Sequence, residues 1–186
     1  LATWQTLSSE RNWSLTETPL RITGRVAGGW VTLGMVLRNP DPSPMDTSDC
    51  FYERRARLRF DEPLGLGLQL RGANTSRQWQ DRLSDPLGRR TVQTGDAAFD
   101  ETFAVQADDL EGGKKLLDEN VRKMLLEVHQ TMDPVWLDDE SIELRDPNPE
   151  TSGDELPRLV PALEELAQVI QETRTKTNDR TQGPYR

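Results

Sequence analysis

Alternation of apolar and polar residues predicts a β-hairpin near the start of the chain. Apolar residues or glycine occupy every second position from Leu20 to Val26, and the alternation resumes from Val31 to Leu37. A period of two is the pattern of a strand that buries one face. Gly28-Gly29 lies between the two runs, and both glycines can adopt the positive φ of a two-residue turn. The predicted register therefore pairs Val26 with Val31.

A second pair of alternating runs, Tyr52–Phe60 and Leu64–Leu70, predicts another hairpin. The connection Asp61-Glu62-Pro63 keeps the apolar faces aligned if it forms a three-residue turn, which sets Phe60 opposite Leu64. This register leaves Arg55, Arg57 and Arg59 on the outer face of the sheet, while Arg54 shares the inner face with Phe60.

Two further stretches have strand character. Phe99–Ala107 alternates except at Glu101, which we expect at an edge or a bulge. Residues 135–144 predict a third hairpin whose loop, Asp138–Ser141, is acidic.

Helical periodicity appears in two longer segments, and a short helix is expected near Trp4. One stripe runs from Leu117 to Val128 and ends before Asp133-Pro134, and a second runs from Leu159 to Ile170 after Pro157. The elements together predict an α+β fold, with an antiparallel sheet of three hairpins plus an extra strand, packed by two amphipathic helices. We expect one domain over residues 1–175 and a flexible tail over residues 176–186.

Composition limits the function classes. Apolar residues make up 34% and charged residues 30% of the chain, and the net charge is −9. Such an acidic protein is not expected to bind nucleic acid, because phosphate contacts require a surplus of Lys and Arg. The charge is uneven, however: residues 51–90 carry a net charge of +4 and residues 96–156 carry −13. These two regions could neutralise each other within the fold or form separate surfaces.

No apolar run reaches the length of about 20 residues that spans a bilayer. The chain begins with Leu1, so we expect it to come from a longer protein, whose other part could hold a membrane anchor. Its one cysteine, Cys50, excludes an internal disulfide, and we expect a cytoplasmic location, with membrane tethering as an option. No cofactor and no metal are expected, because the acidic clusters lack the pattern of a calcium loop.

The candidate binding residues are Arg55, Arg57 and Arg59, which alternate along the outer face of the second predicted hairpin. We hypothesise that they receive an acidic protein or another anionic ligand, with Gly67 and Gly65 opposite Arg57 and Arg59 allowing close approach. The alternative is that neighbouring acidic residues cover all three arginines.

Catalytic interpretations have little support in the sequence. His129, the one histidine, lies near the end of a predicted helix, where a structural role beside the helix dipole is expected. An acid–base site would need carboxylates such as Asp96 or Asp100 beside His129. We therefore expect a non-enzymatic interaction or sensory module and keep a small enzyme with a site near His129 as the alternative. A third option is an oligomerisation domain that uses the second helix.

The order of elements carries a resemblance. Gly95-Asp96, Phe99-Asp100 and Phe103 precede a Leu-rich helix, a short hairpin over residues 135–144 and a closing helix. This layout resembles uncharacterised bacterial soluble domains that follow transmembrane segments. The resemblance implies a soluble domain held near a membrane and implies no catalytic residues.

Overall fold

The computed structural model describes residues 1–38, 51–72, 90–132, 134–146, 157 and 159–181. The strands are β1 (Ser14–Glu17), β2 (Leu20–Val26), β3 (Gly29–Arg38), β4 (Phe51–Phe60), β5 (Gln69–Gly72), β6 (Arg90–Thr91), β7 (Phe103–Ala107), β8 (Val135–Asp138) and β9 (Ser141–Asp146). The helices are α1 (Ala2–Arg11), α3 (Ala97–Thr102), α4 (Leu110–Leu116), α5 (Glu119–Thr131) and α6 (Val160–Thr181).

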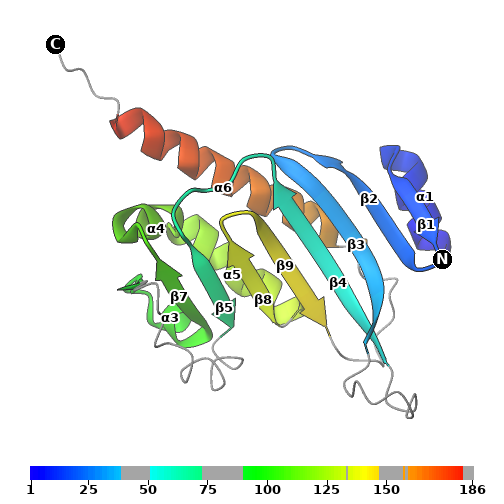
Figure 1. The fold of residues 1–186 in the computed structure, drawn as a ribbon, viewed down its shortest axis with the longest axis horizontal. Coiled ribbons are helices and arrows are strands. Elements are labelled where there is room, and N and C mark those ends of the chain that lie inside the picture. Colours follow the sequence, from blue (N-terminus) through cyan, green and yellow to red (C-terminus); the bar gives the residue numbers. More distant parts are fainter. Residues whose placement is uncertain (39–50, 73–89, 133, 147–156, 158, 182–186) are drawn as a thin grey trace.

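The nine described strands form one sheet in the order β1-β2-β3-β4-β9-β8-β5-β7-β6, and every neighbouring pair is antiparallel (Figure 1). The predicted α+β class is confirmed, although the sheet has more strands than three hairpins and one strand supply.

The first hairpin forms between β2 and β3, but its register differs from the prediction by two residues. Val26 pairs with Gly29 instead of Val31, and the turn consists of Ala27 and Gly28. Gly28 adopts a φ of +81°, so a single left-handed residue suffices for this turn. Gly29 is needed within the strand, because a Cβ there would lie 2.2 Å from the Arg59 carbonyl oxygen. A shift of two residues keeps the same side chains in the core.

The second predicted hairpin is wrong. Strand β4 pairs with β3 and β9, whereas β5 pairs with β7 and β8, so the β8–β9 hairpin separates the two runs. Phe60 does not pair with Leu64. Residues 61–68 form a crossing segment over the end of the β8–β9 hairpin, in which Leu64 N–H donates to the Asp139 carbonyl at 2.8 Å.

The side chain of Asp139 holds this crossing segment in place. Its carboxylate accepts hydrogen bonds from the backbone N–H groups of Leu66, Gly67 and Leu68 at 3.2, 2.8 and 2.9 Å. Gly65 and Gly67 adopt positive φ in this segment. Because β4 pairs with β3 and β9, neither glycine lies opposite an arginine of β4 as predicted. The third hairpin is confirmed, with Leu137 paired to Ile142, and its acidic turn has a structural role.

The predicted strand Phe99–Ala107 is a helix followed by a strand. Asp96 caps α3 by accepting a hydrogen bond from Phe99 N–H, and β7 begins only at Phe103. Glu101 is therefore an exposed helical residue and not part of a strand edge or bulge. Phe99 and Phe103 are four residues apart, a spacing that serves a helix as well as a strand.

Helices α4, α5 and α6 lie on the same side of the sheet (Figure 1). The apolar stripe predicted near the C-terminus is buried in the single chain, including Leu163, Leu166 and Ile170. This burial leaves the stripe unavailable for the oligomerisation role considered above. Helix α6 continues to Thr181 and so includes part of the segment predicted as a tail, residues 176–186.

The alternation of burial along the central strands separates two faces of the sheet. Ile22, Val31, Leu33, Leu58 and Ile142 are fully buried beneath the helices. The opposite side, which we call the open face, consists of the outward side chains of β2, β3, β4, β8 and β9. None of the described helices covers it (Figure 1).

Candidate functional site

Strand register brings the three predicted arginines together with residues from β3 and β9 on the open face. Arg55 lies opposite Gly34 on β3 and Arg145 on β9. Arg57 lies between Thr32 and Glu143, and Arg59 lies between Trp30 and Ser141. The arginines thus lie near the middle of the sheet.

Arg55 is covered by acidic neighbours, as the alternative interpretation predicted. Its guanidinium lies 3.0 Å from a carboxylate oxygen of Glu53 and 3.4 Å from one of Glu143. Arg145 is bonded to the same Glu143. These four side chains, Glu53, Arg55, Glu143 and Arg145, form the paired network, in which the charges of opposite sign are equal in number.

Arg57 and Arg59 have different surroundings. Both side chains are exposed, and Arg57 donates to the neutral Ser141 hydroxyl at 3.2 Å. Neither arginine side chain has an acidic partner in the described part of the chain, and the side chain of Arg59 forms no hydrogen bond or ion pair there. Two positive charges are therefore free to meet a ligand.

A cleft of about 360 Å³ lies beside these two arginines. We call it the Trp30 cleft, and its lining residues are Thr23, Trp30, Thr32, Arg57 and Arg59. Thr23 and Thr32 face each other across β2 and β3, with their hydroxyl oxygens 3.5 Å apart. The cleft therefore combines two guanidinium groups, two hydroxyls and one indole ring.

Among the described side chains of the open face, Trp30 is the large apolar one that is accessible, with 48% of it exposed. The guanidinium of Arg25 lies 5.4 Å from its ring centre, within cation–π range, and Arg25 is held by Asp61 at 2.7 Å. By contrast, Arg145 lies 3.6 Å from the ring centre of Trp136, which is half-buried. Exposed aromatic rings beside arginines are typical of binding surfaces.

Sequence reasoning did not select Trp30, Thr23 or Thr32. The signal was present, because Trp30 has the outward parity of its strand, where a polar residue is expected. A large aromatic residue at an outward position is the feature that could have identified the cleft.

The residues of the enzyme alternative have structural contacts. His129 packs edge-on against Phe103, with ring centres 5.2 Å apart. Asp96 caps α3 and lies 3.3 Å from the Arg122 guanidinium. These contacts give no geometric support to an acid–base site, and the alternative stays untested.

Asp100 belongs to a loop that its own side chain orders. Its carboxylate accepts hydrogen bonds from the Thr94 hydroxyl at 2.8 Å and from the N–H groups of Thr94 and Gly95. Partial burial acts to raise the pKa of Asp100, but these hydrogen bonds and the charge of Arg122 together hold the pKa below its usual value. Asp100 is therefore kept ionised, which suits a structural anion better than a general acid.

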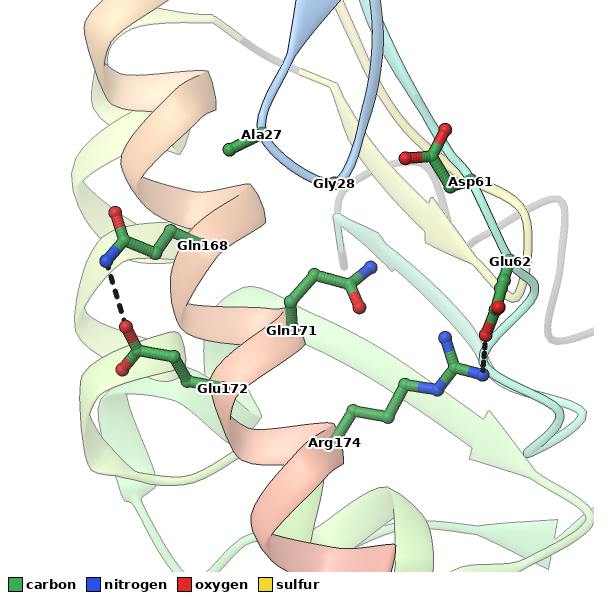
Figure 2. A pocket seen from close by; sticks show the side chains of 8 residues that line it. All are labelled: Ala27, Gly28, Asp61, Glu62, Gln168, Gln171, Glu172 and Arg174. Carbon is green, nitrogen blue, oxygen red and sulfur yellow. Dashed lines mark hydrogen bonds and ion pairs between the residues drawn. The ribbon is translucent and has the colours of Figure 1, made fainter.

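A larger cavity, of about 670 Å³, lies between the β2–β3 turn, the start of the crossing segment and α6 (Figure 2). Its charged and amide groups bond to each other: Arg174 with Glu62 at 2.9 Å, and Gln168 with Glu172 at 2.9 Å. Because its polar side chains are already paired, this cavity is a weaker candidate than the Trp30 cleft.

Other sequence features fall outside these sites. No group of three His, Cys, Asp or Glu side chains in the described ranges could hold a metal ion. Cys50 and the acidic residues 41–49 lie outside the described residues. Within the described part of the chain, no helix combines the length and apolar character needed to cross a membrane.

No protein-family model matches the chain, and no curated protein matches it in sequence. Among solved structures, the chain is similar to the crystal structure of the mycobacterial trehalose monomycolate transport factor A, TtfA. The two are 11% identical, the match covers 90% of this chain and 94% of that one, and the TM-score is 0.48. This likeness is too distant to support a functional argument.

Proposed function

We propose that the protein is a non-enzymatic interaction module that binds an acidic group of a partner in the Trp30 cleft. The observation that carries this proposal is the contrast among Arg55, Arg57 and Arg59, the arginines of β4 on the open face. Arg55 is neutralised by Glu53 and Glu143, whereas Arg57 and Arg59 have no acidic partner among the described residues.

The chemistry of the cleft favours an anion. Guanidinium groups are weakly hydrated and present N–H donors in a planar fork that matches an oxyanion. The threonine hydroxyls can donate further hydrogen bonds, and the indole offers an apolar surface beside them. The described cleft contributes no carboxylate that would compete with a bound anion.

The net charge of −9 does not oppose this function. Charges more than about 10 Å apart are largely screened at physiological ionic strength, so the local charge of the cleft governs a bound anion. The overall negative charge would instead slow the approach of an acidic partner, which makes the encounter dependent on salt.

Charge reversal tests the proposal. We expect wild-type protein to bind a fluorescein-labelled hexaglutamate peptide at physiological ionic strength, measured by anisotropy, and the double variant Arg57→Glu/Arg59→Glu to lose this binding. The matched control is Lys114→Glu/Lys123→Glu, which changes the net charge equally at two exposed positions on α4 and α5.

The control separates a local site from a general charge effect. Retained binding in the lysine variant and lost binding in the arginine variant support the proposal. Equal losses in both variants, or no binding by the wild-type protein, would contradict it. Circular dichroism of each variant checks that the fold is intact.

A further inference from the structure

We infer that the acidic group selected by the Trp30 cleft is a phosphomonoester dianion carried next to a planar ring on a small molecule. The inference rests on the proposed function and names the ligand class for the same site. It follows from the number of donors in the cleft, their charge and the position of the indole.

The two free guanidinium groups come from alternate residues of one strand. Arg57 and Arg59 point to the same side of β4 and lie about 7 Å apart along the backbone, a separation that long side chains bridge easily. A single carboxylate carries one negative charge and two oxygens, which one guanidinium fork satisfies. A phosphomonoester carries a charge of about −1.5 to −2 and three acceptor oxygens, so it matches both arginines.

Further donors lie beside the arginines. The Thr23 and Thr32 hydroxyls line the cleft, and among the described residues they are bonded at most to each other, at the long separation of 3.5 Å. Arg57 uses one of its N–H groups on the Ser141 hydroxyl, which leaves the others available and restricts its position. An acceptor-only ligand with three oxygens can use this donor set fully.

The indole of Trp30 forms the apolar part of the cleft. Almost half of its surface is exposed, and Arg25, anchored by Asp61, lies within cation–π range of its ring. A planar ring attached to the phosphate could stack against it. The volume of about 360 Å³ is near the lower end of the range of roughly 300–1,000 Å³ for small-molecule sites, so the ligand should be small.

Three soluble probes test the ligand class with the full chain. Phenyl phosphate supplies both the dianion and the ring, inorganic phosphate lacks the ring, and phenylacetate has a ring with a carboxylate. Isothermal titration calorimetry should show that phenyl phosphate binds at least about tenfold more tightly than either other probe. Its affinity should fall as the pH drops through about 6, where the phosphate loses its second charge.

Variants assign each part of the ligand to its residue. Trp30→Leu should reduce the affinity for phenyl phosphate to that for inorganic phosphate, and Arg59→Gln should reduce the affinity for both. Arg59→Lys should restore little, because a lysine keeps the charge but loses the planar fork. Lys123→Glu is the control that should leave all affinities unchanged.

The possible failures can be told apart. Equal affinities for phenyl phosphate and phenylacetate, both lost in Arg57→Glu/Arg59→Glu, would overturn the phosphate assignment while the proposed function stands. If inorganic phosphate bound as tightly as phenyl phosphate, the inference that the ligand carries a planar ring would be overturned. Binding to phosphatidic acid vesicles without binding to phenyl phosphate would overturn the small-molecule ligand and assign the phosphate to a lipid headgroup. No binding of any of these probes or of hexaglutamate would overturn the proposed function as well.

Discussion

The carboxylate of Asp139 is predicted to be a main determinant of stability, because it fixes the crossing segment between β4 and β5. It accepts three backbone hydrogen bonds from Leu66, Gly67 and Leu68. Each hydrogen bond to a half-buried carboxylate contributes on the order of 1 kcal/mol after competition with water. We therefore expect Asp139→Ala to lower the free energy of unfolding by about 3 kcal/mol. Asp139→Asn keeps one acceptor oxygen and should lose less.

Urea unfolding followed by far-ultraviolet circular dichroism measures this effect. The matched control is Glu140→Ala, which removes the same charge from the same turn, since the Glu140 side chain is exposed and its hydrogen bonds come from its backbone. The control should change stability by no more than about 0.5 kcal/mol. Equal losses in both variants would show that the charge of the turn matters and the three hydrogen bonds do not.

Two further predictions concern the packing and the pH dependence of the fold. Gly24→Ala should destabilise the protein by roughly 1–3 kcal/mol in urea unfolding, because the new Cβ would lie 1.9 Å from the indole of Trp13, whereas Gly34→Ala, whose nearest atom would be 3.5 Å away, should be tolerated. Asp100 has a lowered pKa in the folded state, so its contribution is present above the unfolded pKa of about 3.9 and is lost as the pH falls through the lower folded value. The stability difference between wild type and Asp100→Asn should therefore shrink as the pH falls below about 3.9, and a difference independent of pH would refute this account.

Local patterns predicted the elements that depend on their own periodicity. Strands β2 and β3, the β8–β9 hairpin and the helices α5 and α6 bury most of the residues that alternation or helical spacing selected, with Leu20, Met35 and Met124 only partly buried. In each case the pattern only has to say which side chains face the core. The alternation pattern could not reveal the two-residue error in the β2–β3 register, because a shift of two residues changes the pairing partners but leaves each side chain on the same face of the sheet.

Pairing between distant strands could not be predicted in the same way. The run Leu64–Leu70 alternates like a strand. In the structure, Leu64 and Leu68 are buried, but they belong to a segment that contains two glycines with positive φ. The glycines at alternate positions, Gly65 and Gly67, argued against a strand there, since glycine weakens the interior of a strand. Nothing in the local sequence showed that the β8–β9 hairpin would insert beside β4. The hydrogen bond between Gly67 and Asp139 joins residues some seventy positions apart, a separation that local patterns do not report.

Arg55, Arg57 and Arg59 alternate along one face of β4 and are equivalent in the sequence, but the structure predicts opposite effects of replacing them. Arg55→Ala should lower stability by about 1–2 kcal/mol, because it leaves Glu53 and Glu143, whose side chains are only 10% and 12% exposed, with fewer positive neighbours. Arg57→Ala and Arg59→Ala should stay within about 0.5 kcal/mol of wild type in the same urea assay, since neither has an acidic partner among the described residues, while both lose binding to hexaglutamate. A residue whose removal lowers binding affinity but leaves stability unchanged contributes to the binding site and not to the fold. If replacing Arg57 or Arg59 lowered stability as much as replacing Arg55, the fold alone would explain these arginines. The proposal that the Trp30 cleft is a binding site would then be contradicted.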